Sequence, residues 1–120
     1  MDRMDKINEQ LKKEISIILQ KELGDPRVKF VTITKADVSR DLKFAKVSFS
    51  VLGNNQKVQD AQKGLDKAKG FIRKFVGESM KMRYTPELLF IHDRSLEYSA
   101  RIEETLKEIH HDLEKNSPDH

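Results

Sequence analysis

The sequence predicts a single α+β domain in which helices cover one face of a three-stranded sheet. Two long stretches carry apolar residues at helical spacing, two short stretches between them have strand patterns, and one short apolar stretch follows. An antiparallel hairpin followed by a helical crossover to a third strand gives this architecture. We expect residues 1–115 to form the domain and residues 116–120, which hold no core residues, to form a flexible tail.

The first element expected is an amphipathic helix over residues 3–23. Apolar side chains recur there at helical spacing, namely Ile7, Leu11, Ile15, Ile18 and Leu19. Gly24 stands where a helix C-cap belongs, and Asp25-Pro26 follows it. The helix is therefore expected to end at this point.

Two strands are expected next, joined as an antiparallel hairpin. Residues 30–38 are rich in β-branched side chains. Residues 43–51 alternate between two sets, Ala45, Val47, Phe49 and Val51 on one side and Phe44, Lys46, Ser48 and Ser50 on the other. This alternation is typical of a strand with one exposed face. The link Ser39-Arg40-Asp41 is short enough for a hairpin.

A second helix is expected over residues 57–84, with Asn54 or Asn55 as its N-cap. Its core-facing stripe consists of Ala61, Leu65, Ala68, Ile72, Phe75 and Val76. Gly70 and Gly77 are weak points in this helix, so we expect a kink or break near residues 68–70.

The last two elements are a strand and a helix. Residues 88–91 are wholly apolar and suit a strand in the interior of the sheet. Ser95 can cap a final helix, whose apolar face would carry Ile102, Leu106, Ile109 and Leu113.

Composition narrows the function. The 120 residues include no cysteine, which excludes disulfides, thiolate catalysis and a cysteine zinc site. The N-terminus lacks the apolar core of a signal peptide, and no stretch approaches the roughly 20 apolar residues of a membrane span. We therefore expect a cytoplasmic protein, and a monomer, because no broad apolar stripe is left over.

Charge is unevenly distributed along the chain. Residues 57–83 hold eight Lys/Arg and three Asp/Glu, a net of +5, whereas residues 84–120 hold four and nine, a net of −5. Such segregation predicts one basic and one acidic side, although two ordinary solvated helix surfaces explain it equally well.

Gly70 lies at the centre of the lysine face of the second helix. An exposed glycine inside a helix costs roughly 1 kcal/mol relative to alanine, so its presence indicates bare backbone facing a ligand. With lysines on both sides, that ligand is expected to be a phosphate chain. The candidate RNA-binding residues are Lys63, Lys67, Ala68, Lys69, Gly70, Arg73 and Lys74, then Lys81 and Arg83 further along, with Arg3, Lys12 and Lys13 on the first helix.

Three candidates have structural alternatives. Arg27 either contacts RNA or forms a salt bridge with Asp25 at the end of the first helix. Phe44 and Tyr84 can stack on bases, although packing in the core or at an edge is the commoner role of an aromatic side chain. Each lysine, taken alone, is also explained as a solubilising surface charge.

No enzyme site emerges. His92-Asp93 follows the last strand and suggests a general base, but neighbouring residues of a strand point to opposite faces, and Asp93 is more simply a turn or cap residue. His110 and His111 lie about 100° apart on a helix and make poor joint metal ligands. We find no nucleophile motif and no glycine-rich phosphate loop, and we expect no catalysis, metal or cofactor.

Four segments follow one another along the chain: Leu23-Gly24-Asp25-Pro26-Arg27-Val28, the hairpin from Val31 to Val51, Ala68-Lys69-Gly70-Phe71-Ile72-Arg73, and Met82-Arg83-Tyr84-Thr85-Pro86-Glu87-Leu88 followed by Phe90-Ile91-His92-Asp93. In this order they resemble the bacterial ribosome-binding factor A family. The resemblance spans residues 3–112 and implies a type II KH-like fold. A KH domain clamps nucleic-acid backbone with a GxxG loop. Here Ala68-Lys69-Gly70 stands in its place as a helix kink, which favours phosphate-led binding over base reading.

The resemblance also implies a function. It is that of a non-enzymatic assembly factor that associates with the small (30S) ribosomal subunit and its rRNA, and assists late maturation and processing of the 5′ region of precursor 16S rRNA. Two alternatives remain. One is a general nucleic-acid-binding KH-like module. The other is an adaptor that binds a protein, such as a ribosomal protein, through an acidic last helix carrying Glu103, Glu104, Glu108, Asp112 and Glu114.

Overall fold

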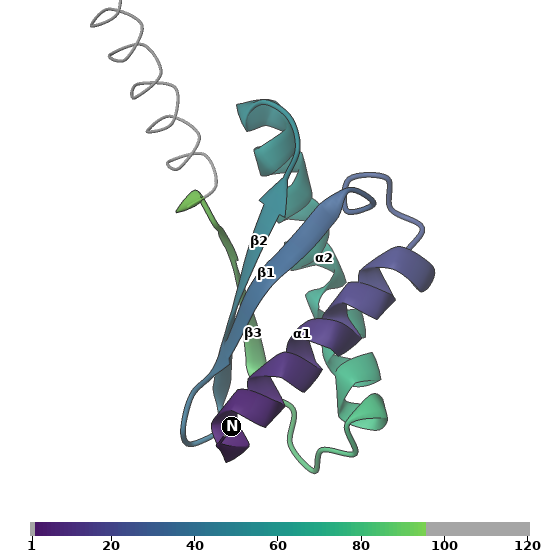
Figure 1. The fold of residues 1–120 in the computed structure, drawn as a ribbon. Helices are drawn as coiled ribbons and strands as arrows, with labels where there is room; N and C mark the ends of the chain where they lie inside the picture. Colours follow the sequence, from purple (N-terminus) through teal and green to yellow (C-terminus); the bar gives the residue numbers. More distant parts are fainter. Residues whose placement is uncertain (1, 96–120) are drawn as a thin grey trace, which may run out of the picture.

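The computed structural model describes residues 2–95 (Figure 1). The elements are α1 (Arg3–Lys21), β1 (Val31–Val38), β2 (Phe44–Val51), α2 (Asn55–Ser79) and β3 (Glu87–His92). The three strands form one sheet in the order β1-β2-β3, and both helices lie on the same side of it. The predicted α+β class and helix–strand–strand–helix–strand order are confirmed. The expected last helix and tail lie outside the described residues.

The helix ends follow ordinary capping chemistry. The Asp2 carboxylate accepts a hydrogen bond from the Asp5 N–H at 2.9 Å, and Asn54 Oδ1 accepts one from the Lys57 N–H at 3.1 Å. Asn54, rather than Asn55, is therefore the N-cap of α2. α1 ends at Lys21 with Glu22 as its C-cap, so the expectation that Gly24 caps it was wrong by two residues.

The sheet combines both kinds of pairing. β1 and β2 pair antiparallel, with Val31 opposite Val51 and Val38 opposite Ala45, and a bulge lies between Ile33 and Lys35. β2 and β3 pair in parallel through the α2 crossover. The predicted hairpin and crossover are confirmed.

β3 corrects one prediction about the sheet. Among residues 2–95 it is an edge strand, not an interior strand, because β2 is the one strand of this range that pairs with it. Leu88 and Phe90 are buried under the helices, whereas Leu89 and Ile91 are 48% and 41% exposed on the opposite face. The apolar residues 88–91 therefore belong to an edge strand with one face covered by the helices and one face exposed. The apolar pattern alone does not distinguish such a strand from an interior one.

α2 is continuous through residues 68–70, so of the expected kink or break, a break is excluded. One helix also occupies the place where an ordinary KH domain has a loop between two helices. Four residues of the predicted stripe are fully buried, and Ala68 and Phe75 are half-buried; the buried ones are Ala61, Leu65, Ile72 and Val76. They pack with Leu11 and Ile15 of α1 and with Val47 and Phe49 of β2 in one core.

Gly64 makes a close contact that the apolar stripe of α2 does not reveal. It is buried, and a Cβ on it would lie 2.8 Å from Val28 Cγ1 and 3.3 Å from Arg27 Cβ. The turn after α1 thus packs directly on the backbone of α2. The position of Gly64 between Ala61 and Leu65, next to the apolar stripe, is the signal in the sequence for this close approach.

Candidate nucleic-acid interface

Gly70 is exposed on α2, as predicted. A Cβ built there meets no atom within 4 Å, so the helix backbone is open to solvent at this point. Beside it lies a hollow of about 360 Å³ between α2 and β3. We call it the Gly70 groove, and its lining is Asp66, Lys69, Gly70, Arg73, Glu87, Leu88 and Leu89.

The β3 wall of the Gly70 groove is fixed by side chains of α2. Arg73 donates from Nε to the Pro86 carbonyl at 3.1 Å and from Nη2 to the Thr85 carbonyl at 3.0 Å. Gln62 Nε2 donates to the Phe90 carbonyl at 2.9 Å. Since peptide groups alternate in direction along a strand, the Leu88 N–H and C=O point to this same edge, between the two anchored positions.

Arg73 therefore holds the approach to β3 through its guanidinium group. The sequence predicted it as a direct RNA contact, but two of its donors bind the protein backbone at the approach to β3. These contacts join residues 12 and 13 positions apart, and no pattern in the sequence pairs them.

The lysines around Gly70 differ in their surroundings. Lys63, Lys67 and Lys74 are exposed. Lys69 is half-buried, and its Nζ lies 3.8 Å from Asp66 Oδ1. An exposed ion pair of this length contributes at most about 1 kcal/mol, so Lys69 can exchange Asp66 for a phosphate at low cost. Four of the predicted cations therefore lie on the same helix as Gly70, three of them exposed and one half-buried.

Arg27 forms the salt bridge with Asp25 that was the alternative to RNA contact. Its Nη2 lies 2.7 Å from Asp25 Oδ2, and its Nε and backbone N–H also donate to the Asp25 carboxylate. These hydrogen bonds lower the pKa of the Asp25 carboxyl. Arg27 therefore closes the turn between α1 and β1, and its predicted RNA contact is not supported by this geometry.

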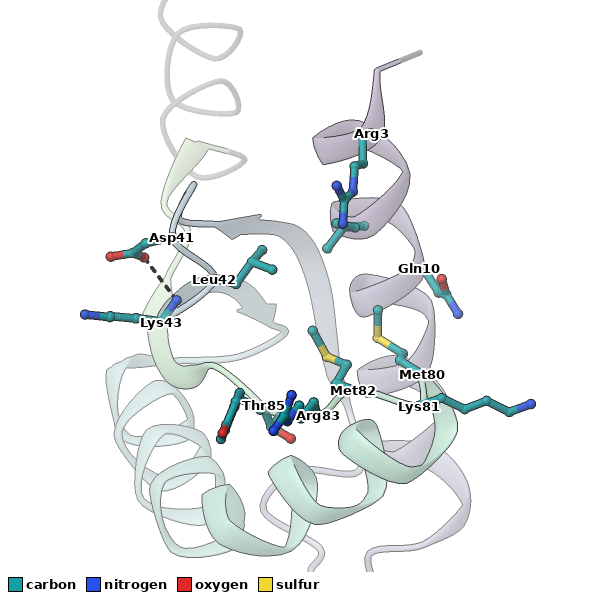
Figure 2. A pocket seen from close by; sticks show the side chains of 12 residues that line it. Arg3, Gln10, Asp41, Leu42, Lys43, Met80, Lys81, Met82, Arg83 and Thr85 are labelled. Atoms are coloured by element: carbon teal, nitrogen blue, oxygen red, sulfur yellow. Dashed lines mark hydrogen bonds between the residues drawn. The ribbon is translucent and has the colours of Figure 1, made fainter.

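The remaining predicted cations lie elsewhere. Arg3, Lys81 and Arg83 line a second, larger hollow of about 700 Å³ at the opposite end of α2 from its N-cap (Figure 2). Lys12 lines a small hollow beside Asp5, Glu9 and Lys35, and Lys13 is exposed on α1. The predicted list therefore divides into two separate basic surfaces, with Lys12 and Lys13 on neither.

His92 and Asp93 do not form a catalytic pair. Asp93 accepts hydrogen bonds from the Thr34 hydroxyl at 2.7 Å and from the Ser95 N–H at 2.9 Å, as expected of a turn residue. Hydrogen bonds from Ser95, and then the one from Thr34, lower the pKa of Asp93 to about 2. The His92 ring packs against Phe49 with a centroid separation of 5.6 Å.

Two kinds of feature are absent from residues 2–95. No group of three or more His, Cys, Asp or Glu side chains is placed to hold a metal ion. Within the same range, neither helix has the length and apolar character that a membrane crossing requires.

Known proteins resemble this chain over most of its length. Residues 3–106 match the family model of ribosome-binding factor A. The ribosome-binding factor A of Halothermothrix orenii is 46% identical over 114 residues, which make up 95% of this chain and 93% of that protein.

Solved structures show the same fold. The crystal structure of ribosome-binding factor A from Thermus thermophilus has a TM-score of 0.70 at 22% identity, covering 78% of this chain and 100% of that one. A homology model of the Thermus thermophilus ribosome binding factor A, fitted into a cryo-EM map of a 30S complex, has a TM-score of 0.62 at 24% identity over 72% of this chain and 91% of that one. The fold is KH-like, as the resemblance implied.

Proposed function

Since this chain belongs to the ribosome-binding factor A family, we propose that it binds the small ribosomal subunit through rRNA contacts on the Gly70 face of α2. The Gly70 face comprises Gly70, Lys63, Lys67, Lys69 and Lys74. Family membership supports a ribosome-binding assembly factor. The 30S complex of the Thermus thermophilus protein supports the choice of subunit.

One observation carries the choice of surface: the open backbone of Gly70 beside lysines and a groove. A phosphate chain can approach the helix closely there because no side chain stands in its way. Lysine Nζ groups then replace the counterions of the RNA, which makes affinity depend strongly on salt. The edge of β3, held by Arg73 and Gln62, gives the groove a fixed second wall.

The finer role we propose is in late maturation of the subunit, during processing of the 5′ region of precursor 16S rRNA. The protein would stabilise one arrangement of the rRNA by binding it more tightly than its alternatives. We assign it no catalytic step, so its release follows from a change in the RNA or from another factor. This function places it in the cytoplasm, where the subunits are assembled.

Co-sedimentation with isolated ribosomal subunits tests this function. We expect saturable binding to the small subunit, little to the large subunit, and loss of binding as salt rises. The Lys69→Glu/Lys74→Glu double variant should bind at least tenfold more weakly, because two phosphate contacts become repulsive. The matched control is Lys12→Glu/Lys13→Glu, which makes the same charge change on α1 and should bind nearly as the natural protein does.

Two results would contradict the proposal. Equal binding to both subunits would reduce the protein to a general RNA binder. If the Lys69→Glu/Lys74→Glu variant is folded, as judged by circular dichroism, and binds the small subunit equally well, the Gly70 face is not the binding surface. Association that survives ribonuclease would favour the adaptor alternative, whose acidic helix lies outside the described residues.

A further inference from the structure

We propose that the cavity at the end of the molecule binds one unstacked nucleotide of a single-stranded RNA. The cavity holds about 700 Å³ and lies where the N-terminus of α1, the β1–β2 loop and the α2–β3 segment meet (Figures 1 and 2). It shares no lining residue with the Gly70 groove. The inference rests on the proposed function and gives the RNA a second contact of a different kind.

The floor of the cavity is apolar. Ile7 of α1, Leu42 of the β1–β2 loop, and Met80 and Met82 beyond α2 are half-buried around it. Figure 2 shows Leu42 reaching in from one side and the two methionines standing on the other. Flexible thioether side chains adapt to flat ligands, and the volume lies within the range of about 300–1,000 Å³ found for small-molecule sites. A nucleobase fits such a floor better than water does.

The rim of the cavity is basic. Arg3, Lys43, Lys81 and Arg83 line it together with one carboxylate, Asp41, so its formal net charge is +3. The Asp41 carboxylate already accepts hydrogen bonds from the Ser39 hydroxyl at 2.6 Å and the Lys43 N–H at 3.0 Å. In Figure 2, Lys43 and Lys81 extend outward on opposite sides. Cations around an apolar floor match the phosphate and base of a nucleotide.

Tyr84 supplies a stacking surface. Its side chain is 76% exposed at the cavity, and the Arg83 guanidinium carbon lies 5.6 Å from the centre of its ring. This exposure excludes a place for Tyr84 in the core. An arginine-backed tyrosine on a basic rim is the arrangement that single-strand binding surfaces use to hold bases.

The backbone is strained at this cavity. Leu42 (φ 62°) and Lys81 (φ 53°) are the non-glycine residues with positive φ in the described chain, and both line it. Lys81 follows the C-cap of α2, where the Met82 N–H bonds to the Gly77 carbonyl at 2.9 Å. Glycine is the favoured residue at such a position. A lysine kept there at a conformational cost points to a use for its charge.

The opening of the cavity to the surface favours a base of a single-stranded RNA as its ligand. The cavity opens to the surface, so it can accept a base that has left the stack, whereas a duplex keeps its bases inside the helix. A strand also presents the neighbouring phosphates to cations on both sides of the opening. A free nucleotide has the same base and phosphate chemistry, and competition separates the two sources.

Fluorescence anisotropy with a labelled six-nucleotide single-stranded RNA tests the inference. Tyr84→Ala should weaken binding by about 5- to 100-fold, because stacking on an aromatic ring is lost. Tyr84→Phe should bind as the natural protein does, because the ring remains. The same strand annealed into a duplex should compete poorly against the single strand, and so should a mononucleotide.

Three outcomes would overturn the inference. They are equal binding by Tyr84→Ala and the natural protein, equal competition by duplex and single strand, and equal competition by a mononucleotide. The Lys69→Glu/Lys74→Glu variant separates this failure from that of the proposed function. If the Lys69→Glu/Lys74→Glu variant loses subunit binding while Tyr84→Ala keeps its RNA affinity, the result supports the Gly70 face as the interface and contradicts the nucleotide site in the cavity.

Discussion

Gly70 and Lys81 are positions where stability favours a different residue. Gly70 is an exposed helical glycine with open space around it, where alanine is better by roughly 1 kcal/mol. Lys81 has φ 53°, where a side chain costs about 1–2 kcal/mol relative to glycine. Both residues lie on surfaces that we assign to RNA. Under the two proposals, RNA binding explains why these residues occupy the two positions, and variants at each position can be measured separately for affinity and for stability.

Alanine at two glycines of α2 should have opposite effects on stability. Gly70→Ala should raise the free energy of unfolding by about 0.5–1 kcal/mol, because its Cβ meets nothing. Gly64→Ala should lower it by about 1–3 kcal/mol, because its Cβ would lie 2.8 Å from Val28 Cγ1. Urea unfolding measures both effects. Gly70→Ala should also bind the small subunit more weakly. Equal affinity would mean that RNA does not approach the exposed backbone at Gly70.

Glycine at position 81 should stabilise the fold and weaken RNA binding. Lys81→Gly relieves the positive φ, for an expected gain of about 1 kcal/mol in the free energy of unfolding. It also removes one cation from the rim of the cavity, so affinity for the single-stranded six-nucleotide RNA should fall several-fold. Urea unfolding and anisotropy measure the two effects. A variant that is more stable and binds equally well would show that Lys81 has no role in binding.

For helices and strands, the sequence predicts the elements themselves well but predicts poorly which elements and side chains lie next to one another. Apolar periodicity gives both described helices and all three strands within two residues at every end but one, since α2 ends at Ser79 and not at residue 84. The edge position of β3, the close approach at Gly64 and the partners of Arg73 depend on contacts between segments distant in the chain. The cation list shows the same limit, because a helical projection places charges on a face but does not divide them between two cavities.

Arg73 fixes the approach to β3, so a lysine should not replace it. Lys in Arg73→Lys keeps the charge but cannot reproduce the forked hydrogen bonds to the Thr85 and Pro86 carbonyls. We expect a loss of about 1 kcal/mol in the free energy of unfolding, measured in urea. Lys74→Arg, an exchange at an exposed neighbour, is the control and should change little. If Arg73→Lys keeps full stability and loses only RNA affinity, Arg73 is the direct contact that the sequence first suggested.

The Asp93 carboxylate accepts hydrogen bonds from Ser95 and from Thr34 of β1, and these bonds should give stability a dependence on acid pH. Folding lowers the pKa of Asp93 to about 2, so its contribution is complete above the unfolded pKa of roughly 4 and is lost as pH falls toward 2. In Asp93→Asn, thermal stability should fall less steeply between these values. Parallel curves for the two proteins would show that Asp93 contributes nothing to acid sensitivity.

At the scale of the whole molecule, one small domain presents two basic surfaces with different chemistry. The Gly70 face offers open backbone and lysines, which suit phosphates, whereas the cavity beyond the C-terminal end of α2 offers an apolar floor and Tyr84, which suit an unstacked base. The core and the strand order hold both surfaces in place. A protein built this way can recognise an rRNA region where a backbone and a single-stranded segment lie close together.

The salt dependence of small-subunit binding shows whether the lysines of the Gly70 face contact phosphates. Each lysine that contacts a phosphate contributes about 0.7–0.9 to the slope of log affinity against log salt concentration. Removing Lys63, Lys67 and Lys74 together as alanines should therefore lower the magnitude of the slope by about 2–3. An unchanged slope in a folded variant would mean that the lysines around Gly70 do not touch RNA, and the proposed interface would be wrong.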